Sequence, residues 1–454
     1  MIHDIFPFQQ LNDLEFRHMI DNPSRRIKNI LNENNFKRFV HDTLESGMNK
    51  TVDCNYYTEE SMSDLLKMNK NAFTMLNLNI RSLDRHFCEF VALLYNLDHP
   101  IDVITLTEIG RKNVANRINM LSDRYNCEYI LPKSKKCGGS CILVRKNFKY
   151  HVRNDLRLSF DETEDVWLDL EVNDQKVIVG SVYRHPGTNL NEFQNEFEKT
   201  LQNIDKECCH SFIGGDFNLD GLKIETHRKT AEFYECLMTL NFIPTITLPT
   251  RITETTMTLI DNVFMKINEN NVNSIMISGN LYSDISDHLP NFVILRNEKY
   301  KSTECTRPKV RIFGEKNMSN FMNAFNTSEW NDFFNTTDVN GLLSLFYEKF
   351  NTLFEQSFPL RTLSRKRSKD KIWLTTGLKT AIRQKSVLYR KFLNHPSQQN
   401  KTLYTKYKNI LTSLLRQAET NHYLEKIENK KKEYQSPLAN IWTNNKSWKK
   451  QTTH

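Results

Sequence analysis

Several features that define common protein classes are absent from this sequence of 454 residues. It contains no run of 18 or more apolar residues, so we expect no membrane-spanning helix and no membrane partner. Its first residues, MIHDIFPFQQ, lack the basic stretch and apolar core of a secretory signal. The nine cysteines form no CxxC pair, which argues against a zinc site and a disulfide framework. We therefore expect reduced thiols in a nuclear or cytoplasmic protein that is not secreted.

Two common signatures of phosphate and zinc chemistry are also missing. The sequence has no GxxxxGK(S/T) phosphate-binding loop and no HExxH zinc-binding helix. Any phosphate or metal chemistry must therefore use other residues.

The charge is distributed unevenly along the chain. From Arg361 onward there are 22 Lys and Arg residues against 5 Asp and Glu residues, whereas the chain as a whole carries a net charge of only +8. A strongly basic end on a mildly acidic body indicates contact with nucleic acid. A solvated helical face or a simple spacer would produce the same composition, and the sequence leaves this choice open.

The composition and hydrophobic pattern of the sequence change along the chain and predict four segments. Residues 1–70 are polar and Asn-rich, which indicates a mostly helical N-terminal extension. Residues 71–297 contain eight strand-like runs separated by amphipathic helical stretches, the pattern of a two-sheet α/β sandwich. Residues 298–360 are predicted to form a helical connector. Residues 361–454 are predicted to form a basic linker segment of two helices, interrupted by the Pro-bearing stretch NHPSQQN.

Polar residues end or interrupt several of the predicted strands. The clearest example is the stretch SFIGGDFNLD, in which Asp216 and Asn218 stand two residues apart after an apolar run. That spacing predicts both side chains on one face of a strand, although an ordinary turn also favours Gly, Asp and Asn. The other polar residues at such positions are Asn79, Glu108, Tyr183, Arg184, Asp261, Asp287 and His288.

Each of these residues has a structural interpretation when taken alone. Asn79 could cap the following helix, and His288 could be an ordinary loop histidine. Their number within one segment favours a functional site, since such residues collect where a rigid scaffold ends. Carboxylate and amide oxygens suit a hard divalent ion such as Mg²⁺, and an acid–base His completes an inventory for metal-assisted phosphoester hydrolysis.

The order of these motifs resembles the endonuclease/exonuclease/phosphatase superfamily, and within it the apurinic-type endonuclease domain of jockey-like and chicken-repeat-like non-LTR retrotransposons. The matching motifs are LNIRSL, ITLTE, GGSCILVRK, GSVYRHPG, GGDFNLD, TLIDNVF and SDISDHLP. The resemblance implies a four-layer α/β sandwich of two packed mixed sheets flanked by helices, with helical N- and C-terminal extensions. It also implies a Mg²⁺-dependent endonuclease, with Mn²⁺ as a second possible ion, that binds DNA and element RNA.

The resemblance also implies a role for each residue. Asn79 and Glu108 would hold the metal ion, and Asp287 would complete the metal and nucleophile network. Tyr183 would contact the scissile phosphate, and Arg184 a backbone phosphate. Asp216 would activate the attacking water and Asn218 would stabilise the transition state. Asp261 would orient His288 against the phosphate.

Two departures qualify the resemblance. His185 stands where the family commonly has proline, so a different local loop is expected. No (Y/F)ADD box of a reverse transcriptase occurs, so we expect a truncated copy, a fragment of a longer frame or a stand-alone derivative. The predicted function is DNA nicking that leaves a 3′-hydroxyl, as in target-primed reverse transcription. The alternatives are a superfamily phosphoesterase acting on abasic sites, RNA or phospholipid, and a non-catalytic nucleic-acid-binding relic.

Overall fold

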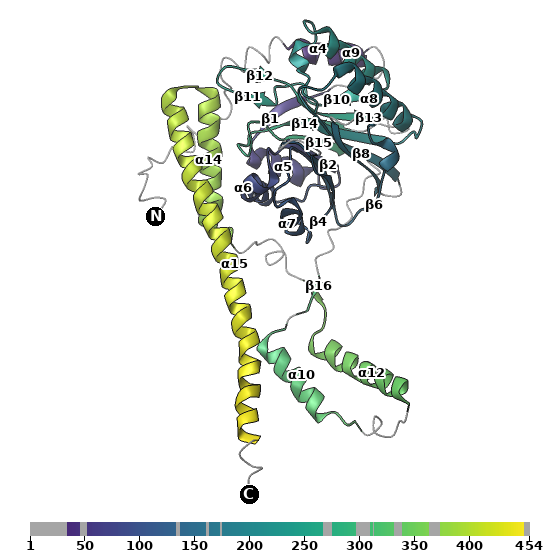
Figure 1. The fold of residues 1–454 in the computed structure, drawn as a ribbon. Helices are drawn as coiled ribbons and strands as arrows, with labels where there is room; N and C mark the ends of the chain where they lie inside the picture. The colour runs from purple at the N-terminus through teal and green to yellow at the C-terminus, as the bar shows by residue number, and fades with distance from the viewer. Residues whose placement is uncertain are drawn as a thin grey trace. The chain divides into compact units, whose positions relative to one another are not determined.

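The computed structural model describes residues 34–45, 52–132, 137–159, 163–172, 175–266, 275–296, 309–311, 313–330, 338–362 and 373–448. Its contacts divide the chain into two compact units, of which the first comprises Met1–Thr303 with Trp373–His454 and the second Glu304–Ile372. Figure 1 draws both units and labels many of their helices and strands.

The first unit contains a mixed sheet of seven strands. Its strands β2 and β3 are parallel neighbours, and β1 pairs in parallel with β14, whereas the remaining pairs are antiparallel. In sheet order the strands are β1 (Cys54–Tyr57), β14 (Ile275–Leu281), β15 (Asn291–Arg296), β2 (Phe73–Asn79), β3 (Val103–Thr107), β5 (Ser140–Arg145) and β4 (Tyr125–Ile130).

A second mixed sheet has six strands, and β8 and β9 are its parallel pair. In sheet order the strands are β10 (Ile243–Pro244), β13 (Asp261–Lys266), β9 (His210–Asp216), β8 (Gln175–Arg184), β7 (Thr163–Val172) and β6 (Lys149–Val152). Between β10 and β13 along the chain, β11 (Arg251–Ile252) and β12 (Met257–Thr258) form a short hairpin.

The two sheets pack face to face because strand residues alternate between two apolar environments. In β2, Phe73 and Met75 join a core cluster with Phe212 and Val263 of the other sheet, whereas Leu76 packs on the helical side. The helices of this unit are α4 (Asn35–Glu45), α5 (Glu59–Met68), α6 (Leu83–Asn96), α7 (Val114–Asn119), α8 (Leu190–Asp205) and α9 (Arg228–Thr239), besides the 3₁₀ turns η1 (Asn154–Leu156) and η2 (Gly221–Lys223).

Helices cover the outer faces of both sheets. The outer cluster of the seven-stranded sheet includes α5 and α6, and that of the six-stranded sheet includes α4, α8 and α9 (Figure 1). Helix, sheet, sheet and helix thus form four layers, which confirms the predicted α/β sandwich. The eight predicted strands form, and helices form between them, as the amphipathic stretches predict.

The basic C-terminal segment forms two helices, as its sequence predicts. Helix α14 (Thr376–Asn394) and helix α15 (Gln398–Trp448) flank the Pro-bearing interruption. We name this pair, over residues 373–428, the C-terminal hairpin. Its apolar side chains, Leu388 and Leu411 among them, are buried in the same cluster as α6 and the seven-stranded sheet.

The second unit contains α10 (Glu315–Thr327) and α12 (Val339–Ser357), with a short ladder of β16 (Lys309–Val310) and β17 (Arg361–Thr362). Its helices meet through aromatic side chains, for example Phe321 against Phe350. Residues 1–33 lie outside the described residues, and β1 adds residues 54–57 of the predicted extension to the large sheet. The four-segment division therefore stays a prediction. No helix among the described residues is long and apolar enough to cross a membrane.

Candidate functional site

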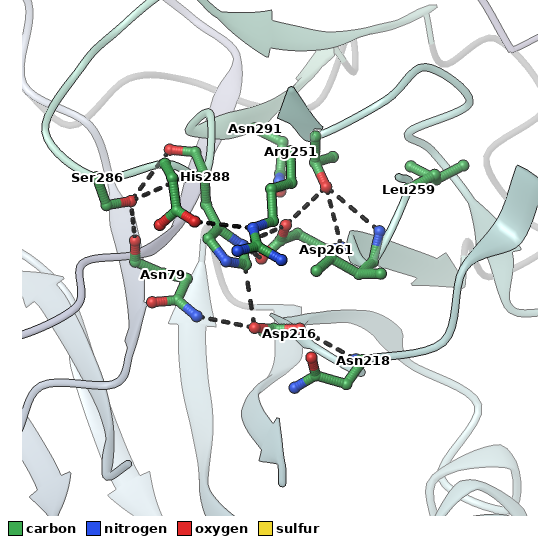
Figure 2. A network of polar contacts seen from close by, with 12 residues as sticks. Asn79, Asp216, Asn218, Arg251, Leu259, Asp261, Ser286, His288 and Asn291 are labelled. Atoms are coloured by element: carbon green, nitrogen blue, oxygen red, sulfur yellow. Dashed lines mark hydrogen bonds and ion pairs between the residues drawn. The ribbon is translucent and has the colours of Figure 1, made fainter. Parts of the chain in front are cut away.

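The polar strand ends of the two sheets meet at one edge of the sandwich. Parallel strands β2 and β3 end at Asn79 and Thr107, and parallel strands β8 and β9 end at Arg184 and Asp216. Because both parallel pairs end here, the side chains that follow them lie within reach of one another. Figure 2 shows the resulting polar network, which includes Asn79, Asp216, Asn218, Asp261 and His288.

Asn79 links the two sheets at the centre of this network. Its Nδ2 donates to Glu108 Oε1 and to Asp216 Oδ2, each at 2.8 Å. Its Oδ1 accepts from the main-chain N–H of Arg81 at 3.2 Å. Asn79 therefore holds two carboxylates from different sheets side by side, which a helix cap alone does not require.

Asp216 faces a second buried carboxylate. It lies directly opposite Asp261 in the antiparallel pairing of β9 with β13, and both residues are buried. Burial first, and then the charge of Asp261, raises the pKa of Asp216 to about 7. A carboxylate in this state can accept a proton from a bound water near neutral pH.

Asp261 and His288 form a buried acid–base pair. The imidazole Nδ1 lies 2.9 Å from Asp261 Oδ2, and Thr250 Oγ1 donates to the same oxygen at 2.6 Å. Burial alone would lower the pKa of His288, but the charge and hydrogen bond of Asp261, with the charges of Asp216 and Asp287, raise it to about 9. His288 therefore keeps its proton at neutral pH, with Nδ1 turned to Asp261.

Asn218 lies in a turn rather than on the strand. Strand β9 ends at Asp216, and Asn218 has a left-handed φ of 50°, so the expectation of one shared strand face is wrong. The main-chain N–H of Asn218 donates to Asp216 Oδ1 at 3.0 Å, and its Nδ2 donates to the carbonyl of Arg184 at 2.7 Å. The turn still holds Asn218 beside the network (Figure 2).

Arg184 is buried beneath this turn. Its Nε donates to the carbonyl of Phe217 at 2.6 Å and its Nη2 to the carbonyl of Asn218 at 2.8 Å. The guanidinium in this position stabilises the loop that carries Asn218. Contact with a backbone phosphate stays a prediction.

Tyr183 lies next to Glu108 and a histidine that the sequence analysis did not assign. Burial, and then the charge of Glu108, raises the pKa of Tyr183 far above its usual value, so the phenol remains a donor. Its ring meets that of His185 edge-on, with 4.8 Å between centroids. His185 Nε2 lies 3.0 Å from Glu164 Oε1. The only sequence feature that pointed to the His185–Glu164 pair was the presence of histidine where the family commonly has proline.

Asp287 is held by two arginines that the sequence analysis also missed. Arg81 Nε lies 3.0 Å from Oδ1, and Arg251 Nε lies 2.8 Å from Oδ2. Burial acts to raise the pKa of Asp287, but the charges of His288 and both arginines outweigh it and lower the pKa. Arg81 follows Asn79 by two residues in LNIRSL, whereas Arg251 lies in the β11–β12 hairpin.

The donors fit a hard divalent cation. Half-buried Glu108 lines a cleft of about 850 Å³ together with Asp287 and Arg81. Glu108 has a left-handed φ of 53°, a costly conformation for a residue with a Cβ and one found at functional sites. The described residues also contain one compact group, Asp216, Asp261 and His288, whose polar atoms lie within 4.8 Å of one another, and with His288 protonated only the two carboxylates of this group could face a cation. Oxygen-rich donors of this kind are those that Mg²⁺ prefers.

One family model matches part of the chain. Residues 177–292 match the model of a family described as endonuclease-reverse transcriptase. The matched residues carry the motifs from GSVYRHPG to SDISDHLP, so the resemblance predicted from the sequence is confirmed over this segment. No curated protein matches the chain.

Three solved structures are among those that align with about half of this chain. The endonuclease domain of TRAS1, a telomere-specific non-LTR retrotransposon, is 13% identical, with 50% of this chain and 99% of that chain covered and a TM-score of 0.38. D. rerio TDP2 complexed with a single-strand DNA product is 14% identical, with coverages of 50% and 99% and a TM-score of 0.36. The human Nocturnin catalytic domain is 13% identical, with coverages of 50% and 93% and a TM-score of 0.38.

The contact with Asp261 leads us to expect an unusually high pKa for His288. We expect NMR to show His288 losing its proton near pH 9, and Asp261→Asn to lower this pKa because it removes the nearest negative charge. The folded-state pKa exceeds the unfolded value of about 6.5. The pair's contribution to stability is therefore complete below that pH and is lost as pH rises through about 9. A wild-type His288 that titrates below pH 6.5 would contradict this assignment.

Proposed function

We propose that the protein is a metal-dependent phosphodiesterase that nicks one DNA strand and leaves a 3′-hydroxyl, as in target-primed reverse transcription. One observation supports the proposal most strongly. A continuous hydrogen-bonded chain runs from the half-buried carboxylate of Glu108 through Asn79 to Asp216, which lies 4.0 Å from the Asp261–His288 pair. The proposal draws its support from the closeness of these groups, in which Glu108 would serve as a cation ligand, Asp216 as the proton acceptor and His288 as a protonated imidazole.

In this proposal Glu108 and Asn79 hold a Mg²⁺ ion, with Asp287 at the edge of the same cleft, and Mn²⁺ can replace it. When bound there, such an ion would neutralise negative charge on the phosphate. His288 donates a hydrogen bond to a phosphate oxygen, and Tyr183 donates a second. Asp261 keeps the His288 ring protonated and correctly oriented.

The proposed reaction is hydrolysis at phosphorus. A water molecule gives its proton to Asp216 and its oxygen bonds to the phosphorus atom. The bond from phosphorus to the 3′-oxygen breaks, that oxygen takes up a proton from solvent water, and Asp216 returns its proton to solvent. The products are a 5′-phosphate and a 3′-hydroxyl. Asn218 stabilises the charge that develops on the phosphoryl oxygens.

A plasmid assay tests this proposal. We expect the full chain to convert supercoiled plasmid to the open-circular form with Mg²⁺ and not with EDTA. A DNA polymerase should then extend the nicked product directly, because extension requires a 3′-hydroxyl. Cleavage only of abasic DNA, RNA or a phosphoinositide would instead identify another superfamily phosphoesterase. Binding of DNA or element RNA without any hydrolysis would favour the non-catalytic alternative.

A further inference from the structure

The C-terminal hairpin is anchored to the body of the first unit by buried polar groups as well as by apolar contacts. Lys385 of α14 is almost wholly buried, and its Nζ lies 3.0 Å from Asp284 Oδ1. Two other buried acids, Glu59 and Glu89, face the same ammonium group. Removal of one partner of a buried ion pair is strongly destabilising, because it leaves an uncompensated buried charge. The pair therefore ties α14 to Asp284.

Two side chains of α15 hold the same aspartate. The hydroxyl of Tyr404 donates to Asp284 Oδ2 at 3.1 Å. Lys408 Nζ donates to the main-chain carbonyl of Asp284 at 3.1 Å and to the Tyr404 oxygen at 3.2 Å. Three groups from two helices thus hold both the side chain and the backbone of Asp284, more than 90 residues earlier in the chain.

Asp284 lies in the loop between β14 and β15 that carries Asp287 and His288. On the far side of this loop, Ser286 Oγ donates to the carbonyl of Asn79 at 2.6 Å and accepts from the main-chain N–H of His288 at 3.1 Å. The polar network therefore holds one end of the loop, at Ser286 and His288 (Figure 2). The C-terminal hairpin holds the other end, at Asp284.

The C-terminal hairpin also lies beside the active-site cleft. Tyr389, Tyr404 and Lys408 line the same cleft as Glu108 and Asp287. Across it, Lys401 Nζ lies 2.6 Å from Glu254 at the tip of the β11–β12 hairpin. This ion pair is half-exposed and contributes little energy, but it places α15 against a second element of the site.

We infer that the C-terminal hairpin is part of the nuclease and positions the catalytic loop through Asp284. Lys385, Tyr404 and Lys408 act as positioning residues for His288 and Asp287. The inference rests on the proposed function and extends it, because it places residues needed for catalysis 97 or more positions beyond His288. In this inference the basic segment holds the residues of the chemical step in place, in addition to any contact that it makes with nucleic acid.

A matched pair of variants in the full chain tests this inference. Asp284→Asn removes the acid that the C-terminal hairpin holds. Glu419→Gln is the control, because Glu419 is also a buried acid in an ion pair between α15 and the body, 2.7 Å from Arg117 on α7. Both variants should lower the melting temperature. Only Asp284→Asn should lower kcat, by about tenfold or more, since misplacement by about 1 Å can cost on the order of a hundredfold.

Amide hydrogen exchange provides a readout that does not depend on activity. We expect faster exchange over residues 283–288 in Asp284→Asn and in Lys385→Met, and no change there in Glu419→Gln. If the wild type fails to nick DNA, the proposed function fails, and exchange still decides whether the C-terminal hairpin orders the loop. Wild-type kcat and exchange in Asp284→Asn would overturn the inference. An equal loss of kcat in Glu419→Gln would also overturn it, because general destabilisation would then explain both.

Discussion

Glu108→Gln is expected to reduce Mg²⁺-dependent nicking by on the order of a hundredfold or more while the fold is retained. Glutamine keeps the size of the side chain and still accepts the hydrogen bond from Asn79, which now lies 2.8 Å from Oε1. It lacks the negative charge that a divalent cation requires. The measurement is the nicking rate of the plasmid over a range of Mg²⁺ concentrations, with circular dichroism to confirm folding.

The matched control is Glu171→Gln. Glu171 is exposed on β7 and pairs with Lys149 at the surface, so its replacement should leave the rate near that of the wild type. Chelation of the wild type with EDTA should reproduce the Glu108→Gln result. Full activity of Glu108→Gln in EDTA would refute the proposed mechanism.

His288→Ala and Asp216→Asn should each lower kcat by at least about a hundredfold, the usual scale for one acid–base or phosphate-stabilising group. His288 Nδ1 lies 4.0 Å from Asp216 Oδ2, and Asn79 holds the same oxygen of Asp216. Because the two side chains serve one step, the double variant should lose less than the product of the single losses. Single-turnover rates at saturating DNA measure this directly.

His151→Ala is a suitable control, since His151 is exposed on β6 and outside this network. If both single variants of the pair cut at nearly the wild-type rate, the active site lies elsewhere. If the two losses multiply in full, Asp216 and His288 act in separate steps.

The strands that the sequence predicted share a local signal. In β2 and β9, apolar residues fill both sheet faces and a polar residue or turn ends the run, and burial of these strands follows from that pattern alone. Strand β4 reads YNCEYI and is only partly buried at the edge of the large sheet, so its sequence carries a weak signal. Strand β1 is only four residues long and forms through its pairing with β14, more than 200 residues away.

Several residues of the candidate site were visible in the sequence, but their arrangement was not. A polar side chain at the end of an apolar run is visible in sequence, which is why Asn79, Glu108 and Asp216 could be named. The turn at Asn218 was misjudged because a spacing of two fits a strand and a left-handed turn equally well. Arg81 and Arg251 were missed because isolated arginines are common on surfaces, and only their shared partner, Asp287, distinguishes them.

The sequence by itself determined the sandwich class and the order of the motifs, and it supplied the candidate polar groups, because hydrophobic periodicity and residue chemistry are local properties. The tertiary structure alone decided that Asp216 faces Asp261 across two strands and that Lys385 is buried against Asp284. Both contacts join residues far apart in the chain, and both depend on removal of water from charged groups. The proton affinity of Asp216 and the position of the loop that carries Asp284 follow from that burial. No short stretch of sequence specifies it.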